Sequence, residues 1–328
     1  MSGTTRRSFL RLSGVAVAPL AVSHGADQQH SHGGWDGVET PTARTLHDVV
    51  HIEEGAVAVG AGGVVLDRTA DGWTLVTDSG PSGNGNNLRG VAATARGERV
   101  WVAGASGAVG EYDPASGSVT DRTAPDGVTT TFTDIAVAGP AGDATVYLVD
   151  ASGHVIVSEQ NGQAETWTRA TPGSGAAIAG IAASASAAFL VDENDAVFKT
   201  TDGETWDELE TPAFDETLTD IAMRSAETVV LAGDSGAIVV GSDGEWDQES
   251  AADGALHDVE VEACGCVHAV GASGTVVHRM EYKAPPLRTL ARWFDWWTRA
   301  SPTGENLYGI AVGRPHIAVG ASGTILER

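Results

Sequence analysis

The sequence predicts an all-β fold, a seven-bladed β-propeller whose four-stranded antiparallel blades close into a ring. Three observations predict it: a glycine-rich turn recurs between short apolar strands, a start signature recurs seven times, and tryptophan marks the last strand of several repeats. The start signatures are spaced near the ~40–50 residues of a four-stranded blade. This internal repeat favours one large domain, although 328 residues would otherwise allow two.

The glycine turn is clearest at residues 271–274 and 320–323, where Gly-Ala-Ser-Gly separates two apolar strands. Looser copies stand at residues 59–63, 103–107, 149–153, 191–195 and 232–236. Glycine suits such a turn because it accepts a positive φ without a Cβ clash. We expect each copy to join the second and third strands of one blade.

Each repeat starts with a large apolar residue, one variable residue, and then Asp or Gly. The seven starts are Leu46, Leu88, Phe132, Ile178, Leu218, Leu256 and Leu307. Short strands of mostly valine, isoleucine and alanine should follow, buried on both faces of each sheet. The fourth strand carries a tryptophan in five repeats, at Trp73, Trp167, Trp206, Trp246 and Trp297.

The two ends of the predicted domain, residues 35–328, should complete one blade together. Residues 35–41 resemble a last strand that lacks the strands before it, whereas the final repeat lacks its last strand. We therefore expect residues 35–41 to pair beside Ile325 and to close the ring. A closed ring leaves no large unpaired sheet edge, through which such sheets otherwise associate, and we expect a monomer.

The N-terminus is predicted to be an export signal, residues 1–23. Arg6 and Arg7 precede an apolar run that is shorter than the ~20 residues needed to span a bilayer. This pattern resembles the twin-arginine signal of proteins exported after folding. We expect an extracellular or envelope-surface protein with no further transmembrane span; an uncleaved signal acting as an anchor is the alternative.

A flexible tail, residues 24–34, is predicted to follow the signal. Its three histidines, His24, His30 and His32, could catch a metal, but tails that merely contain histidine are commoner. We predict no metal site and no cofactor.

The formal charge of -25, with only two lysines, is typical of proteins from salt-loving organisms. At 1 M salt the Debye length is only about 3 Å, so an acidic surface does not repel itself strongly. The chain has no basic stripe that could neutralise phosphates. Nucleic acid is therefore disfavoured as a partner.

Residues 162–167 and 201–206 resemble the Asp-box turn of sialidase-type (BNR) repeats. Together with the Gly-Ala-Ser-Gly turns, they give the chain a resemblance to the photosystem II stability and assembly-factor-like propellers, which are WD-repeat-like. The chain would be a haloarchaeal, exported member of that group. The resemblance implies a protein that binds a partner during assembly of a membrane complex, without catalysis.

The variable position after the start residue carries the candidate ligand-binding side chains. They are His257, Tyr308, His47 and Arg89, in repeats that become contiguous once the ring closes. Since the first strand is innermost in a propeller, they should lie at one mouth of the central channel. They could bind an anionic group, a carbohydrate or an acidic protein tail, or they could pack between blades with their polar ends satisfied. A glycan-binding or glycan-cleaving propeller is thus the alternative function.

Two other repeated residue types favour structural roles. Aspartates at the third position could line a cation site, but acceptance of backbone N–H groups is favoured: Asp48, Asp134, Asp220 and Asp258. Serines in the glycine turns lack the strand-to-helix context of a nucleophile elbow: Ser106, Ser273 and Ser322. A turn residue must recur in several blades, whereas a catalytic residue need not. We predict no catalytic residue.

Repeat six carries the two cysteines, Cys264 and Cys266, in the turn between its first two strands. In an oxidising exterior they could form a disulfide. A ring closed across one residue is strained and readily reduced, so a turn staple is expected and a redox switch is the alternative.

Repeat six also has the one large insertion, residues 281–295, which should lie on the same face as the cysteines, opposite the mouth. Arginine and tryptophan are enriched at binding hot spots, so the insertion could dock a protein, or it could rest on its own blade. The candidate docking residues in and beside it are Arg288, Arg292, Trp293, Phe294 and Trp296.

Overall fold

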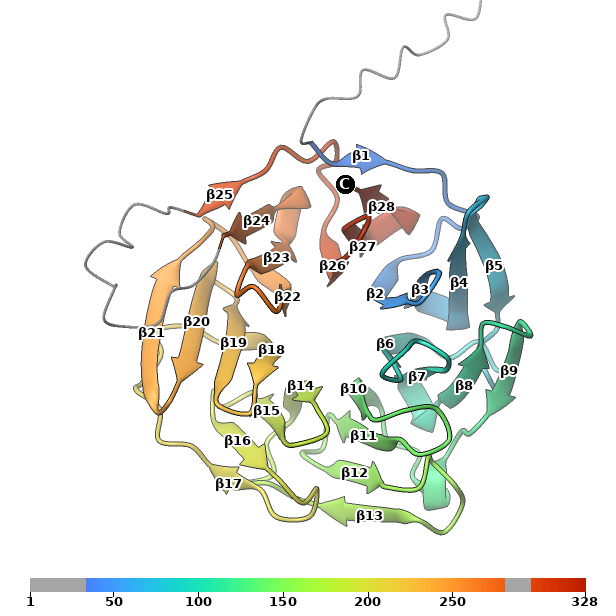
Figure 1. The fold of residues 1–328 in the computed structure, drawn as a ribbon, viewed down its shortest axis with the longest axis horizontal. Helices are drawn as coiled ribbons and strands as arrows, with labels where there is room; N and C mark the ends of the chain where they lie inside the picture. The colour runs from blue at the N-terminus through green and yellow to red at the C-terminus, as the bar shows by residue number, and fades with distance from the viewer. Residues whose placement is uncertain (1–33, 281–295) are drawn as a thin grey trace, which may run out of the picture. The chain divides into compact units, whose positions relative to one another are not determined.

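The computed structural model describes residues 34–280 and 296–328 (Figure 1). The chain divides into two units, Met1–His32 and Gly33–Arg328. The second unit consists of seven four-stranded antiparallel sheets arranged as the blades of a propeller. The predicted fold class is confirmed. In every blade the first strand lies nearest the axis and the fourth strand lies at the outside.

The strands of each blade succeed one another from the axis outward. Blade one comprises β2 (Leu46–Ile52), β3 (Gly55–Gly60), β4 (Val64–Thr69) and β5 (Gly72–Asp78). Blade two comprises β6 (Leu88–Ala93), β7 (Val100–Gly104), β8 (Val109–Asp113) and β9 (Ser118–Asp121). Blade three comprises β10 (Phe132–Ala138), β11 (Thr145–Asp150), β12 (Val155–Ser158) and β13 (Trp167–Ala170).

The remaining blades follow the same plan. Blade four comprises β14 (Ile178–Ala183), β15 (Ala188–Asp192), β16 (Val197–Thr200) and β17 (Asp207–Glu208). Blade five comprises β18 (Leu218–Ser225), β19 (Thr228–Gly233), β20 (Ala237–Ser242) and β21 (Glu245–Ser250). Blade six comprises β22 (Leu256–Val261), β23 (Val267–Gly271), β24 (Val276–Arg279) and β25 (Trp297–Thr298). Blade seven comprises β26 (Leu307–Ala311), β27 (Ile317–Gly320), β28 (Ile325–Glu327) and β1 (Asp36–Gly37).

All seven predicted start residues are the first residues of innermost strands. The glycine turns join second and third strands, as predicted, and four of them form short 3₁₀ helices: η1 (Ala61–Gly63), η2 (Ala105–Gly107), η4 (Ala272–Gly274) and η5 (Ala321–Gly323). A fifth short helix, η3 (Pro125–Gly127), lies between β9 and β10. Ser106, Ser273 and Ser322 adopt positive φ of 57°, 55° and 57°. These serines are therefore turn residues.

The last glycine of the turn is required by close packing as well as by its backbone conformation. Gly107 has φ of +71°, and a Cβ atom there would lie 2.5 Å from the carbonyl oxygen of Val128. Real Cβ atoms do not approach backbone this closely, so any other residue would push the turn away from the neighbouring loop.

The N-terminal strand β1 closes the ring by pairing with β28 (Figure 1). Asp36 lies opposite Glu327, and Gly37 opposite Leu326. The backbone N–H of Val38 donates a hydrogen bond of 3.1 Å to the carbonyl of Ile325. The expected closure beside Ile325 is thus confirmed, and blade seven is built from both ends of the domain.

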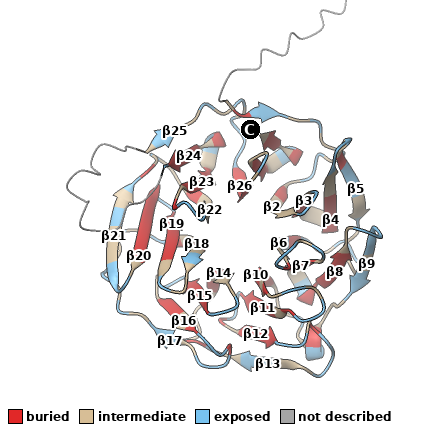
Figure 2. Cartoon of the chain, viewed as in Figure 1, coloured by how far each residue is buried: buried red, intermediate tan, exposed pale blue. Residues whose placement is uncertain are grey.

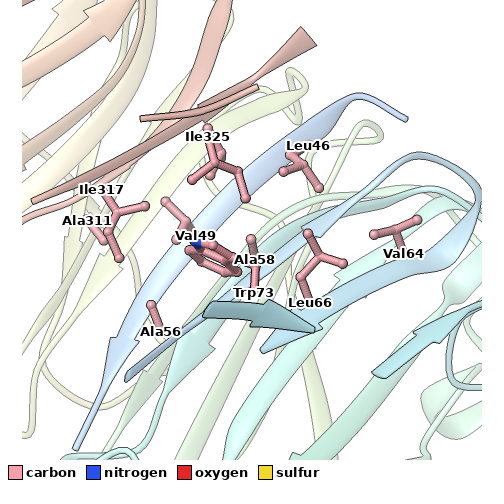
Figure 3. Packing of buried hydrophobic residues seen from close by; sticks show 11 residues of the cluster. Leu46, Val49, Ala56, Ala58, Val64, Leu66, Trp73, Ala311, Ile317 and Ile325 are labelled. Carbon is pink, nitrogen blue, oxygen red and sulfur yellow. The ribbon is translucent and has the colours of Figure 1, made fainter. Parts of the chain in front are cut away.

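The hydrophobic core consists of layers of buried side chains between neighbouring blades. Figure 3 shows the layer between blades seven and one, where Trp73 packs among small aliphatic side chains. Alanines such as Ala56 and Ala58 let the sheets approach closely. Burial falls toward the outside, so that β9 and β25 carry mostly exposed residues and β13 carries no buried one (Figure 2). Within residues 34–280 and 296–328, no helix has the length and apolar character to cross a membrane.

Candidate functional site

The innermost strands surround an axial channel with a cavity of about 360 Å³. It is lined by side chains from all seven blades, including His47, Arg89, His257 and Tyr308. The four side chains predicted to lie at one mouth are therefore together on the axis. Whether they bind a ligand remains a prediction.

A β-bulge places each of these side chains. In blade one, Leu46 pairs with Gly60 and Asp48 pairs with Val59, so His47 is left without a partner on β3. The same shift occurs in all the other blades. A bulge breaks the alternation of side chains along a strand. The variable residue and the aspartate that follows it can therefore both line the axial channel.

The two histidines also hold neighbouring blades together. His47 Nδ1 lies 2.6 Å from the carbonyl oxygen of Leu88, and His257 Nδ1 lies 2.8 Å from that of Leu307. A carbonyl oxygen can only accept, so Nδ1 carries a proton and donates it in both rings. These contacts between blades are of the kind that the packing interpretation predicts, and ligand binding by the two histidines remains a prediction.

In two other blades, a threonine at this position also forms a hydrogen bond to the next blade. The hydroxyls of Thr133 and Thr219 each donate a hydrogen bond of 2.7 Å to a carbonyl of the next blade, at Ile178 and Leu256. The variable position thus supplies a bond between blades wherever it is followed by aspartate.

The aspartates make a second bond between the same blades. Asp48 Oδ1 accepts from the N–H of Val49 at 2.7 Å, and its Oδ2 accepts from Val91 of the next blade at 2.7 Å. Asp134 repeats both contacts, with Ile181 of the next blade at 2.9 Å. The bonds from Val259 to Asp220 and from Ile310 to Asp258 complete the set. This agrees with the favoured role of these residues as acceptors of backbone N–H groups.

Blades two, four and seven carry glycine at the aspartate position because space is lacking there. A Cβ atom at Gly90 would lie 2.8 Å from Asp134 Oδ1, and one at Gly180 would lie 2.7 Å from Asp220 Oδ1. Among the described residues of these blades, we find no hydrogen bond from the variable side chain to a backbone carbonyl of the next blade. Arg89 is exposed at the mouth.

Tyr308 contacts both histidines of the mouth. Its ring stacks on His257, with ring centroids 5.1 Å apart, and meets the edge of His47 at 6.3 Å. Blades six, seven and one are therefore contiguous around the axis, as expected from closure. An aromatic face, two imidazoles and a guanidinium can together receive a planar or hydroxylated group.

In the channel, burial raises the pKa values of four carboxyls. Burial raises the pKa of Asp134 to about 7, and the charge of Asp220 adds to the effect. The same two causes raise the pKa of Glu260 to about 7. Burial and neighbouring carboxylates raise the pKa values of Asp48 and Asp258 well above their ordinary range. Sequence reasoning missed Glu260, although its position two residues after Asp258 on one strand was a usable signal.

The opposite face of blade six carries the cysteine turn. Cys264 and Cys266 form a disulfide in the turn between β22 and β23. Arg279, the last residue of β24, pairs with Val267 next to this turn, so β24 ends on the face that carries the cysteines. The insertion, residues 281–295, lies outside the described residues. Arg288, Arg292, Trp293 and Phe294 lie outside the described residues.

Trp296 and Trp297 directly follow the insertion, and their environments differ. The indole of Trp296 donates a hydrogen bond of 3.0 Å to Glu249 of blade five, and the Arg279 guanidinium lies 5.7 Å from its ring. Trp296 thus joins two blades instead of standing free. Trp297 is 48% exposed, and sequence reasoning assigned it only a strand position.

The same face holds a group of potential metal ligands from blades six and seven. Glu262, His268 and His316 each offer one ligand atom within 4.8 Å of the others. Burial, helped by neighbouring charges, lowers the pKa of His268 to about 3, and burial also lowers the pKa of His316.

Comparison with known proteins shows the fold alone. No protein-family model matches the sequence, and no curated protein matches it. Solved structures do match: YCF48 bound to a D1 peptide is 14% identical with a TM-score of 0.68, covering 90% of this chain and 95% of that one. The WD40 propeller of Doa1 is 11% identical with a TM-score of 0.69, covering 89% and 94%. A streptogramin B lyase is 10% identical with a TM-score of 0.70, covering 89% and 96%. The chain shares its fold with binding propellers and with an enzyme.

Proposed function

We propose that the chain binds a protein segment at the outer strand of blade six and does not catalyse a reaction. In this proposal it acts as an exported monomer that assists assembly or stability of an envelope complex. The observation that carries the proposal is the exposure of Trp297 beside the insertion. Tryptophan is among the residue types most enriched at interface hot spots.

The Trp297 side chain is held in place by its neighbours. The guanidinium of Arg299 lies 5.4 Å from the Trp297 ring, and the His278 ring meets it edge-on at 5.3 Å. His278 is itself tied to the backbone, because its Nδ1 lies 3.2 Å from the carbonyl oxygen of Trp297. An exposed side chain that is already ordered loses little conformational entropy on binding.

The strand that carries Trp297 also offers a backbone edge. Among the residues that the structure describes, β25 pairs only with β24, and it is the outermost strand of the blade. An extended segment can add to such an edge through main-chain hydrogen bonds, while an apolar side chain of the segment contacts the indole. Met280, the residue that follows β24, is also exposed, at 57%.

The test compares Trp297→Ala with Leu75→Ala in the full-length protein. Leu75 is a matched control, since it is 46% exposed and lies on β5, the outer strand of blade one. Each variant is crosslinked in native envelopes and the captured proteins are identified by mass spectrometry. We expect a defined set of envelope proteins that is retained with Leu75→Ala and lost with Trp297→Ala. Identical captured sets for both variants would reject this docking site.

The mouth supports a second candidate, a glycan-binding propeller. The observation that favours it is Tyr308 stacked on His257 at a cavity that Arg89 also lines and that is large enough for a sugar ring. Arg89→Ala should abolish saturable binding on a glycan array, with Trp297→Ala unaffected. Absence of binding by the unaltered protein would remove this candidate.

A further inference from the structure

Glu262, His268 and His316 converge from separate elements at the junction of blades six and seven. Glu262 follows β22, His268 lies on β23, and His316 immediately precedes β27. The sequence separates His316 from the other two by a full blade repeat. The group lies on the face that carries the cysteine turn, far along the strands from the mouth residues.

The three side chains approach a common point without bonding to one another. Glu262 Oε1 lies 3.6 Å from His268 Nε2 and 4.0 Å from His316 Nε2. Both distances exceed the ~2.7–3.2 Å of a hydrogen bond. In a tetrahedral site with metal–ligand bonds of about 2.0–2.1 Å, ligand atoms lie about 3.3 Å apart. All three ligand atoms lie within 4.8 Å of one another. Shifts of up to about 1.5 Å would therefore bring both nitrogens to coordinating distance from a metal shared with this oxygen.

We propose that Glu262, His268 and His316 bind a divalent transition metal of the zinc class. Two imidazole nitrogens with one carboxylate oxygen form a ligand set that zinc accepts, and such a set disfavours Ca²⁺ and Mg²⁺, which prefer oxygen. With the sulfur atoms joined in the disulfide, Cys264 supplies no thiolate, although its Sγ lies 3.1 Å from Glu262 Oε2. The fourth position is left for water or for a partner's side chain.

The neighbouring histidine, His278, is excluded from the site by its own bonds. Its ring lies 5.9 Å from that of His268, but Nδ1 contacts the Trp297 carbonyl and Nε2 lies 3.0 Å from Arg299. His268, by contrast, is 5% exposed and directs Nε2 at Glu262. A buried imidazole of this kind is held in position by packing, which preorganises the site.

Metal binding requires one rearrangement at His316. The N–H of Gly313 donates to His316 Nδ1 at 3.1 Å, so the neutral ring carries its proton on Nε2. When Nε2 binds the metal, the proton moves to Nδ1 and the Gly313 N–H must turn to solvent. Gly313 lies in the loop between β26 and β27, where such a change is local.

The test is a titration of the full-length protein with Zn²⁺ by calorimetry, in a large excess of Mg²⁺ to occupy surface carboxylates. All samples carry His24→Ala, His30→Ala and His32→Ala, so that the tail cannot bind the metal. We expect one equivalent of Zn²⁺ per chain, and a tetrahedral absorption spectrum when Co²⁺ replaces Zn²⁺. Glu262→Gln and His316→Asn should each weaken binding at least tenfold.

Two control variants distinguish this site from metal binding elsewhere on the chain. His154→Gln removes a histidine that lies 3.0 Å from a single carboxylate, Asp150, and it should leave the affinity unchanged. The double variant Cys264→Ser and Cys266→Ser should also retain one equivalent. Binding that survives Glu262→Gln and His316→Asn, or that depends on the cysteines alone, would overturn the assignment. So would the absence of stoichiometric binding by folded protein, with folding checked by circular dichroism.

Discussion

Glu327 accepts two hydrogen bonds from the guanidinium of Arg68, a residue 259 positions earlier in the chain. The distances are 2.7 Å from Nε to Oε1 and 2.8 Å from Nη2 to Oε2. The indole of Trp73 donates a third bond of 2.9 Å to the same carboxylate. Blades seven and one are therefore joined at the seam of the ring, beside the strand that closes it.

Replacing this carboxylate should weaken the seam. Burial by itself would raise the pKa of Glu327, but the bonds from Arg68 and Trp73 outweigh it and lower the pKa. Glu327→Gln should reduce the free energy of unfolding by about 1–3 kcal/mol at neutral pH, measured by urea denaturation. Because the native pKa is depressed, this loss should shrink as the pH falls below the ordinary glutamate range.

The control for the seam is a salt bridge that does not join blades. Arg99 and Asp113, at 3.1 Å, lie together on blade two, and Asp113→Asn should change stability by less than about 1 kcal/mol. Equal losses of unfolding free energy in the two variants would mean that the seam contact stabilises the protein no more than a salt bridge within one blade.

Trp35 should be a large contributor to the stability of the closed ring. It is 4% exposed and packs with Val270, Leu307 and Leu326 between blades six and seven. Trp35→Ala should cost about 3–5 kcal/mol of unfolding free energy. Trp297→Ala, on the exposed outer strand, should change it by less than about 0.5 kcal/mol. A small effect at Trp35 would show that the ring does not depend on its closing strand.

Glu260 should make the protein less stable as the pH rises. Its pKa is about 7 in the native protein, above its ordinary value, so the native state holds the proton more tightly than the unfolded state. The stabilisation is present at low pH and is lost between about pH 4.5 and pH 7. Relative to the parent protein, Glu260→Gln should gain about 1–3 kcal/mol across this range.

The comparison with the parent is needed because His268 has the opposite effect on stability. Its pKa is lowered in the native protein, so its contribution to stability increases as the pH rises. An exposed glutamate, Glu54, supplies the control, and Glu54→Gln should show no such gain. Parallel stability curves for Glu260→Gln and the parent would contradict the burial of this carboxyl in the channel.

Asp134 should be needed for the bond between blades three and four. Asp134→Ala leaves the N–H groups of Ile135 and Ile181 without their acceptor and should cost about 2–3 kcal/mol. Asp134→Asn keeps one acceptor and should cost less. Thermal unfolding at about pH 5.5, below the raised pKa of Asp134 of about 7, is the measurement. Unchanged stability of Asp134→Ala would show that these bonds are dispensable.

The sequence was sufficient for the architecture because the features that specify it are local. Each blade begins at an apolar residue followed by a bulge, and each glycine turn needs a left-handed backbone, as at Gly107. Closure could also be predicted, because residues 35–41 and the strand near Ile325 each lack a partner in sequence. Patterns of this kind repeat, and repetition makes them recognisable without any alignment.

The roles of individual polar side chains were decided only by the tertiary structure. His47 donates to a carbonyl 41 residues away, and Trp296 bonds to Glu249 of the preceding blade. Glu262, His268 and His316 converge although they come from two blades. The physical reason is that hydrogen bonds and metal ligation depend on distances of a few ångströms between elements, which packing sets and no local pattern encodes.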